Sequence, residues 1–284
     1  MTQIFDKIVQ KLSLAGIESP RLEARLILAA AKKSECAEIS AFTELNDTEC
    51  ALVEKMLEQR LKHKPLDKIL GHREFYKYDF LCNENVLSPR SDTEILVEQA
   101  AKLIFKHNLK NALELGIGSG CILLSLLADF SFLCGTGVDI SKKALEVAKK
   151  NAENLDVDKR LNLRCADWND DNFVFAFKKK FEIIVSNPPY IPSDDIAGLA
   201  PEVRYFDPIE ALDGGKSGFA AYERIAKIAP SILAENGFLL FESGYNQAHK
   251  IAEICEENEL KVLEIVKDLA GIERCIIAKK KIIK

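Results

Sequence analysis

Closely spaced cysteines and histidines are absent from this chain. Among its 284 residues are eight cysteines and four histidines, but there is no C-x-x-C pair and no histidine pair at metal-ligand spacing. The sequence therefore predicts no metal site and no disulfide framework. Because several cysteines lie in apolar runs, we expect reduced thiols that are mostly buried and behave as small hydrophobic side chains.

Membrane and export signals are missing as well. No uninterrupted apolar run approaches the roughly 20 residues that a membrane-spanning helix needs. Residues 1–8 lack a basic region followed by an apolar stretch, so we expect no signal peptide. These absences favour a cytoplasmic protein with no membrane partner.

Positive charge is not in excess. The formal net charge is −5 and the pI is about 5.6, whereas a protein that binds duplex nucleic acid usually presents a basic face. The run Lys178-Lys179-Lys180 is too short to form such a face and is typical of a solvated surface. The charge balance favours a protein or small-molecule substrate and predicts no stable nucleic-acid partner.

The first part of the chain has only helical patterns. Apolar residues recur at helical spacing up to about residue 65, which predicts a small helical domain over residues 1–70. Ser19-Pro20 is expected to begin one helix with a capping hydroxyl, and Asn46 is expected to begin another. A domain of this size is too small for a large active site, so we expect it to dock a substrate.

Residues 71–90 change character. Aromatic residues, Phe75 among them, precede a turn-forming segment at 83–85, which predicts a β-hairpin linker. Ser91 and Glu94 then have the capping-box spacing and predict the start of a helix.

From about residue 111, short apolar segments alternate with helical patterns. This alternation predicts a doubly wound α/β domain over residues 91–284, with a mostly parallel, seven-stranded, Rossmann-like sheet and helices on both faces. The segments that favour strands are 112–115, 137–140, 161–165, 181–186, 237–242 and 274–278, and those that favour helices are 119–129, 141–154, 217–235 and 246–258.

A glycine-rich turn follows the first of these strands. Glu114 precedes Gly116, Gly118 and Gly120, whose spacing is G-x-G-x-G and not the G-x-G-x-x-G that cradles a pyrophosphate. The shorter loop suits a ligand without phosphates, although glycines alone could mark only a tight turn. An acid, Asp139, follows 19 residues after Gly120, close to the distance at which dinucleotide folds place an acid on ribose hydroxyls.

A third strand end adds Asp167 and Trp168. The acid can accept a hydrogen bond from an exocyclic amine, and the aromatic ring can cover a base. Taken singly, Asp139 could be a helix cap and Trp168 a core residue. Because the glycine loop and both acids follow successive strands, the carboxyl edge of the sheet is predicted to bind a nucleoside-like ligand.

The strand at 181–186 runs into Asn187-Pro188-Pro189-Tyr190. Consecutive prolines end a strand, so the tetrapeptide could be only a terminator. It is also a cluster of acceptors: the Asn187 side-chain oxygen and the Pro188 carbonyl can accept both hydrogens of a planar –NH2 group, and Tyr190 offers a face for stacking. This arrangement predicts methylation of an amide or base nitrogen by positioning, with Asn187, Pro188 and Tyr190 as the catalytic residues.

These motifs together resemble those of the release-factor glutamine N5-methyltransferases, which are class I S-adenosylmethionine-dependent enzymes. The resemblance spans nearly the whole chain. The shared segments are 65–75, 88–94, the glycine loop, 187–191, 202–203, 211–215, 242–244 and 268–271. The sequence departs from the family's usual residues at Ser91, Ile117 and Ile272, none of which belongs to the predicted amide acceptors.

The resemblance implies roles for individual residues. It implies that Glu114 and the three glycines line an S-adenosylmethionine site, that Asp139 holds the ribose, and that Asp167 and Trp168 approach the adenine. Asn187, Pro188, Pro189 and Tyr190 would hold the glutamine amide, and Asn187 would also contact the cofactor. Phe75, Pro89, Arg90 and Thr93 belong to motifs near cofactor and substrate, and Phe75 and Arg90 are predicted substrate contacts. The implied partner is a release factor, the implied product is S-adenosylhomocysteine, and a monomer is expected.

Other functions remain open at this stage. A sister enzyme that methylates a ribosomal-protein glutamine would share most motifs, and an adenine-N6 methyltransferase would share Asn187-Pro188-Pro189-Tyr190. The acidic charge balance disfavours the second, because such enzymes must bind phosphates and flip a base. A non-enzymatic binding module would not need the acceptor tetrapeptide.

Overall fold

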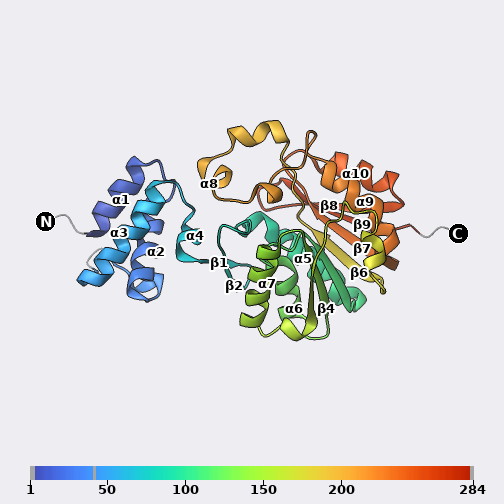
Figure 1. Ribbon diagram of the computed structural model, residues 1–284, viewed down its shortest axis with the longest axis horizontal. Coiled ribbons are helices and arrows are strands. Elements are labelled where there is room, and N and C mark those ends of the chain that lie inside the picture. The colour runs from blue at the N-terminus through green and yellow to red at the C-terminus, as the bar shows by residue number, and fades with distance from the viewer. Residues whose placement is uncertain (1–3, 41–42, 282–284) are drawn as a thin grey trace. The chain divides into compact units, whose positions relative to one another are not determined.

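The computed structural model describes residues 4–40 and 43–281 (Figure 1). These residues form two compact units, which are described separately. Unit 1 contains the chain up to His72 together with residues 200–206, and unit 2 contains residues 73–199 and the chain from Asp207 onward. A stretch that lies far along the sequence thus belongs to the N-terminal unit.

Unit 1 consists of short helices around one apolar core. Its helices are α1 (Ile4–Leu14), α2 (Pro20–Lys32), α3 (Asp47–Leu61), α4 (Leu66–Leu70) and α8 (Pro201–Arg204). At the start of α3 the Asn46 side chain accepts the Glu49 N–H, and the Glu49 carboxylate accepts the Asn46 N–H, each at 2.9 Å. The predicted helix start at Asn46 is confirmed, with a complete capping box.

A buried arginine holds residues 200–206 within unit 1. The Arg60 guanidinium lies 2.6 Å from the Glu23 carboxylate and 3.3 Å from that of Glu202. Burial opposes the charged form of Arg60, but Glu23 and then Glu202 outweigh it and raise the pKa of Arg60. His63 contacts the same Glu202 oxygen at 3.1 Å. These charged side chains therefore connect the helices at the start of the chain to residue 202, which lies more than a hundred residues further along the sequence.

Unit 2 contains a seven-stranded sheet in the order β5-β4-β3-β6-β7-β9-β8. β9 is antiparallel to both of its neighbours, and the remaining pairs are parallel. The strands are β3 (Asn111–Leu115), β4 (Cys134–Asp139), β5 (Leu161–Cys165), β6 (Phe181–Ser186), β7 (Leu233–Glu242), β8 (Leu260–Lys267) and β9 (Glu273–Lys280). The predicted mostly parallel, doubly wound sheet is confirmed.

Helices cover both faces of this sheet (Figure 1). Alternate side chains of β7 point to opposite faces: Leu240 packs with α5 (Glu94–His107), α6 (Cys121–Asp129) and α7 (Lys142–Asn154), whereas Leu239 packs with α9 (Ala220–Ile232) and α10 (Ala248–Glu257). Because β6 and β7 are buried on both sides, residues 183–185 and 238–241 are continuous apolar runs, as is usual for central parallel strands.

One strand of the sheet was not among the segments predicted individually. β8 lies at the edge of the sheet and alternates between buried or half-buried and exposed positions. Charged residues such as Lys261 and Glu264 stand among its apolar ones, so its sequence has no continuous apolar run. It pairs with β9 through a turn at residues 268–272.

The hairpin is present, but its turn differs from the predicted one. β1 (His72–Phe75) and β2 (Tyr78–Leu81) are joined at Tyr76, which has a φ of 58°, and the segment 83–85 forms a separate turn after β2. Tyr76 and Tyr78 both donate hydrogen bonds to Asp129 at the end of α6. These two tyrosines therefore attach the hairpin to the end of α6 in unit 2.

Two predicted helix caps are wrong. Ser19 precedes α2, and proline occupies its first turn, but the Ser19 hydroxyl makes no capping hydrogen bond. Ser91 begins a short 3-10 turn (Ser91–Thr93) that leads into α5, and the Glu94 carboxylate accepts the backbone N–H of Tyr76 at 2.9 Å. Glu94 therefore accepts a hydrogen bond from the hairpin and does not cap its own helix. The spacing of Ser91 and Glu94 in the sequence cannot distinguish these two roles.

Asn151 of α7 connects three parts of unit 2. Its side chain is fully buried; Nδ2 donates to the carbonyl oxygens of Ser119 at 2.8 Å and Leu81 at 3.2 Å, and Oδ1 accepts the Leu81 N–H at 2.7 Å. The carboxamide thereby satisfies backbone groups of the glycine loop and of β2, which have no water to bind instead.

We expect Asn151→Ala to lower the free energy of unfolding by about 1–3 kcal/mol, because it leaves buried backbone groups unpaired. Asn154→Ala, at the exposed end of the same helix, is the matched control and should change it little. Urea unfolding followed by circular dichroism measures both. Equal stability of the two variants would contradict the proposed anchoring role.

Candidate active site

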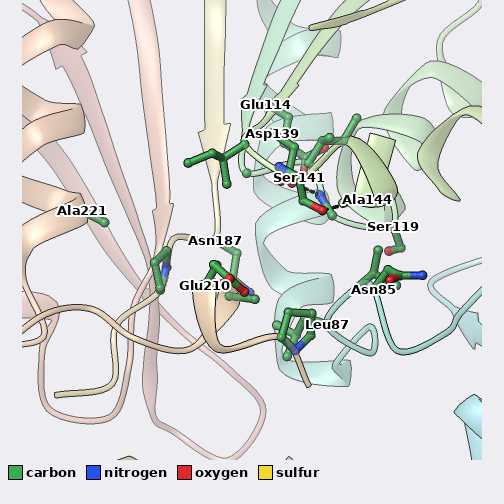
Figure 2. Close-up of a pocket in the computed structure, with 18 of the residues that line it drawn as sticks. Asn85, Leu87, Glu114, Ser119, Asp139, Ser141, Ala144, Asn187, Glu210 and Ala221 are labelled. Atoms are coloured by element: carbon green, nitrogen blue, oxygen red, sulfur yellow. Dashed lines mark hydrogen bonds between the residues drawn. The ribbon is translucent and has the colours of Figure 1, made fainter. Parts of the chain in front are cut away.

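The carboxyl ends of β3 and β6 lie together at the centre of the sheet. From β3 the chain passes to β4 and β5 on one side, and it returns to β6 on the other side of β3. Such a reversal of strand order opens a crevice that commonly binds ligands. A cavity of about 880 Å³ lies here, and Figure 2 shows Glu114, Asp139 and Asn187 entering it from different strand ends.

A side-chain hydrogen bond fixes the two central strand ends. The Ser186 hydroxyl at the end of β6 donates to the carbonyl oxygen of Leu115 at the end of β3, over 2.7 Å, and both residues are fully buried. The tetrapeptide that follows Ser186 therefore begins at a fixed position beside the glycine loop that follows Leu115.

The glycine loop turns back across β4. The N–H groups of Gly116 and Ile117 both donate to the Val138 carbonyl at 2.9 Å, and Gly116, Gly118 and Gly120 have φ values of 76°, 53° and 84°. These positive φ values favour glycine. Ile117 points into the core, where a Cβ atom on Gly137 would lie only 2.2 Å from its Cδ1 atom. Ile117, one of the departures from the family, is thus a packing residue.

Asp139, at the end of β4, holds this loop and faces the cavity. Its Oδ2 atom accepts the Gly118 N–H and its Oδ1 atom accepts the Ser141 N–H, each at 2.9 Å. Burial raises the pKa of Asp139, and these backbone N–H groups partly offset the rise. Since each carboxylate oxygen can accept a further hydrogen bond, Asp139 retains acceptor sites for a pair of hydroxyl groups.

Glu114 lies beneath the loop and is almost fully buried. Its Oε2 atom accepts the Leu123 N–H at 3.0 Å. Burial raises the pKa of Glu114 well above its ordinary value; the Leu123 N–H opposes the rise and the nearby Asp139 adds to it. Two carboxyl groups therefore lie at adjacent strand ends on this wall of the cavity, and a cationic ligand would stabilise their ionised forms.

Trp168 and Asp167 follow β5 and line the same cavity. A Cβ atom on Gly116 would lie 3.5 Å from the Trp168 ring, so the indole lies close against the glycine loop. Arg224 of α9 holds the backbone here, donating to the carbonyl oxygen of Trp168 at 2.7 Å. The half-buried ring thus has a fixed position at which a flat base could stack.

The charge of the cavity wall limits the class of ligand. Its lining includes six acidic residues and two basic ones: Glu84, Glu114, Asp139, Asp167, Glu210 and Asp213, with Arg90 and Lys143. A phosphate group would face repulsion from most of these side chains. The lining instead suits a cationic nucleoside with free ribose hydroxyls.

Asn187 and Pro188 present acceptors that the protein itself does not use. The Asn187 Nδ2 atom donates to the Thr93 hydroxyl at 3.3 Å. Within residues 4–40 and 43–281, no protein donor bonds to Asn187 Oδ1 or to the Pro188 carbonyl oxygen. Pro188 is buried and Asn187 is half-buried, so the two unused oxygens at this position are suited to an external N–H donor.

Glycines hold the rest of the tetrapeptide. A Cβ atom on Gly214 would lie 2.8 Å from Tyr190 Cα, and one on Gly244 would lie 2.8 Å from the Tyr190 ring. Gln247 donates to the Tyr190 carbonyl oxygen at 3.0 Å. Burial raises the pKa of Tyr190, so its phenol stays neutral at ordinary pH. Tyr190 is consequently a rigid, uncharged surface.

Most of the predicted site residues meet at one cavity. Its lining includes Glu114, Gly116, Gly118, Asp139, Asp167, Trp168, Asn187, Pro189, Pro89, Arg90 and Thr93. Phe75 lies elsewhere, in the apolar core against Phe80 with their ring centroids 6.1 Å apart. Gly120, Pro188 and Tyr190 adjoin the lining without belonging to it. The roles of all these residues remain predictions.

The structure adds residues that sequence reasoning had not assigned to the site. Ser141 and Lys143 line the cavity at the start of α7, and Glu210 lines it from the segment before α9 (Figure 2). The Ser141 hydroxyl caps α7 by accepting the Ala144 N–H at 3.2 Å. A serine two residues after the strand-end acid was a usable signal for this cap, whereas nothing local marks Glu210.

No group of histidine, cysteine, aspartate and glutamate side chains suited to a metal ion is found in the described part of the chain. All eight cysteines are free; four are buried, two are half-buried and two are exposed. Within the same residues, no helix is long and apolar enough to cross a membrane.

Comparison with known proteins identifies the family. Residues 3–71 match the PrmC N-terminal domain, and residues 106–282 match a methyltransferase domain. The catalytic domain of hMettl16, solved in complex with MAT2A 3′UTR hairpin 6, has a TM-score of 0.54 at 14% identity and covers 71% of this chain and 74% of that one, which shows a shared fold.

Curated relatives match nearly the whole chain. The release factor glutamine methyltransferase of Rhodospirillum rubrum is 39% identical over 281 residues, covering 98% of this chain and 85% of the relative. That of Caulobacter vibrioides is 37% identical over 272 residues, covering 95% and 93%. The resemblance seen in the motifs is confirmed, and the chain belongs to the release factor glutamine methyltransferase family.

Proposed function

We propose that this protein transfers a methyl group from S-adenosylmethionine to the side-chain amide nitrogen, N5, of the glutamine in the Gly-Gly-Gln motif of peptide-chain release factors. S-Adenosylhomocysteine is the second product. The observation that carries the proposal is the adjacent pair of unused acceptors, Asn187 Oδ1 and the Pro188 carbonyl oxygen, at the edge of the cavity of about 880 Å³.

The cavity residues fit S-adenosylmethionine. This molecule supplies an electrophilic methyl group on a positively charged sulfur. Asp139 has free acceptor positions for the ribose hydroxyls, Trp168 offers a surface for the adenine, and Asp167 can accept from its amino group. The excess of acidic lining residues favours the positive charge and disfavours phosphate-bearing nucleotides. Gly116, Gly118 and Glu114 complete this wall.

The acceptor pair suits a primary amide. An amide nitrogen is a poor nucleophile because its lone pair is delocalised into the carbonyl group. Asn187 and Pro188 would each accept one N–H of the glutamine, which aims the face of the nitrogen at the methyl group. Tyr190 would pack beside the amide. Because an N-alkylated amide cation is strongly acidic, it loses its proton without a dedicated base, and the acceptors stabilise the charge as it develops.

Unit 1 is proposed to dock the protein substrate. The domain division expected from the sequence, with residues 1–70 as a helical docking domain, 71–90 as linker and 91–284 as the methyltransferase domain, is retained as a proposal. Residues 200–206 then belong with the docking unit. Arg90, which lines the cavity and pairs with the buried Asp207 at 2.9 Å, is proposed as a contact that shapes the substrate entrance. Phe75 would act indirectly, by packing beneath the hairpin.

The first prediction concerns the substrate. Purified protein with labelled S-adenosylmethionine should place about one methyl group on each release factor molecule, and mass spectrometry should locate it on the glutamine amide. A release factor with Gln→Ala in the Gly-Gly-Gln motif should remain unlabelled. Preferred labelling of a ribosomal protein, or labelling of adenine in nucleic acid, would overturn the substrate assignment.

The second prediction concerns Asn187. We expect Asn187→Ala to lower kcat by about 100- to 1,000-fold, the usual loss on removing one preorganised polar group from a reaction centre. S-Adenosylhomocysteine should still bind, and the quenching of Trp168 fluorescence can follow it because Trp168 is the only tryptophan of the chain. Unchanged kcat would remove Asn187 from the reaction centre.

The third prediction concerns cofactor affinity. Asp139→Asn should weaken S-adenosylhomocysteine binding by about 10- to 100-fold, because an amide cannot accept from Gly118, Ser141 and a ribose with the same oxygens. Trp168 fluorescence titration measures the change. Asp158→Asn, on an exposed turn, is the matched control and should bind as the unmodified protein does. Equal affinities of the two variants would argue against Asp139 as the ribose ligand.

A further inference from the structure

Glu242 is a buried carboxylate to which the proposed reaction assigns no part. It is the last residue of β7 and is 2% exposed. In the part of the chain that the structure describes, its Oε2 atom has no hydrogen-bond partner. A buried carboxylate with an unpaired oxygen destabilises a fold, so its presence next to the reaction centre calls for a functional reason.

The sheet register places Glu242 beside Asn187. Ser186 of β6 pairs with Phe241 of β7, and Asn187 and Glu242 are the residues that follow them. Phe241 packs on the face covered by α9 and α10. Glu242 is therefore directed to the opposite face, where α5 lies, and Thr93 immediately precedes that helix.

Thr93 connects the two side chains. It is 3% exposed, and its hydroxyl accepts a hydrogen bond from Asn187 Nδ2 at 3.3 Å. A hydroxyl that accepts in this way still has its own hydrogen to donate. The side chains of Thr93 and Asn187 both favour the charged form of Glu242, as hydrogen-bond donors to a carboxylate do.

This arrangement determines which end of the Asn187 carboxamide faces the substrate. An ionised carboxylate only accepts hydrogen bonds, so it repels an amide oxygen and attracts an amide –NH2 group. With Nδ2 held toward Thr93 and Glu242, Oδ1 is left for the substrate. The reverse orientation would present –NH2 to the –NH2 of glutamine and would remove the acceptor that aligns the reacting amide with the methyl group.

We propose that Glu242 and Thr93 are positioning residues that hold the Asn187 carboxamide with its oxygen toward the substrate amide. The inference rests on the proposed function, since it assumes that Asn187 accepts an N–H of the reacting nitrogen. Neither Glu242 nor Thr93 needs to touch the substrate or the cofactor.

The stability of Glu242 variants separates this role from a structural one. Burial raises the pKa of Glu242 to about 7 from its ordinary 4.5, while Thr93, Arg274 and Asn187 oppose the rise and Asp92 adds to it. Because the folded pKa is the higher one, the free energy of unfolding falls as pH rises from 4.5 through 7. At pH 8 the charged carboxylate therefore destabilises the fold, and Glu242→Gln should melt at the same temperature as the unmodified protein or higher.

The kinetic test uses matched variants at pH 8. We expect Glu242→Gln and Thr93→Val to lower kcat by about 10- to 100-fold, the cost of a misplaced group at a reaction centre. KM for the release factor and the affinity for S-adenosylhomocysteine, read from Trp168 fluorescence, should stay within about 3-fold. Thr93→Ser keeps the hydroxyl and should retain kcat. Glu235→Gln, at an exposed position on the same strand, is the control.

A double-mutant cycle decides whether the effect passes through Asn187. In an Asn187→Ala background, adding Glu242→Gln should change kcat by less than about 2-fold, since no carboxamide remains to orient. A full kcat for Glu242→Gln, an equal loss in both backgrounds, or a lowered melting temperature with lost cofactor binding would each overturn the inference. Full activity of Asn187→Ala alone would instead refute the proposed reaction centre.

Discussion

The hydrogen bond from Ser186 to the Leu115 carbonyl oxygen is the constraint on which the site depends. It ties the ends of β3 and β6 at the point where the strand order reverses, and two chemically different segments leave the sheet there. The glycine loop leaves on the side proposed for the cofactor, and Asn187 and Pro188 leave on the side proposed for the substrate. With their starting points fixed by one buried contact, a donor methyl group and an acceptor amide can meet without any flexible element between the two walls.

The chemistry of the two walls differs in a way that suits this reaction. The wall proposed for the cofactor includes the carboxyl groups of Glu114 and Asp139, whose burial raises their pKa, and a cation beside them would stabilise their charged forms. The wall proposed for the substrate presents the neutral oxygens of Asn187 and Pro188, which can accept hydrogen bonds. Neither wall holds a histidine or a reactive thiol: burial raises the pKa of Cys121, the one cysteine that lines the cavity, far above its ordinary value. The site is thus built to orient an amide and to stabilise positive charge, and not to supply a nucleophile or a strong base.

The sequence was sufficient for features that depend on local chemistry. The glycine loop, Asp139 and the tetrapeptide at 187–190 each follow the end of a strand, and residues of all three line one cavity, while their roles stay predictions. The doubly wound sheet followed from the alternation of short apolar segments with helical patterns. β8 was missed because an exposed edge strand carries charges among its apolar residues, and the Ser91–Glu94 cap was wrong because Glu94 bonds to the hairpin turn instead.

Contacts between distant segments could not be predicted in this way. Asn151 resembles any polar residue on a helix, yet it joins the glycine loop to β2. Residues 200–206 read as part of the catalytic domain, but Glu202 belongs to unit 1 through Arg60. In each case a buried polar group bonds to a residue far away in the sequence. Such a partner cannot be read from the sequence, because the group becomes buried, and costly to leave unpaired, only in the folded chain.

Glu242 extends this reasoning from stability to catalysis. A fold selected only for stability would replace a carboxylate whose pKa is raised by burial with a neutral side chain of similar size. The two ends of a carboxamide have nearly the same shape, so packing alone cannot distinguish Asn187 Oδ1 from Nδ2. A neighbouring carboxylate, which only accepts hydrogen bonds, can distinguish the two ends because it attracts the –NH2 group and repels the oxygen. A negative charge beside a carboxamide is therefore a physical means of setting its orientation, and in the role proposed for Glu242 the correct orientation of Asn187 offsets the local cost in stability.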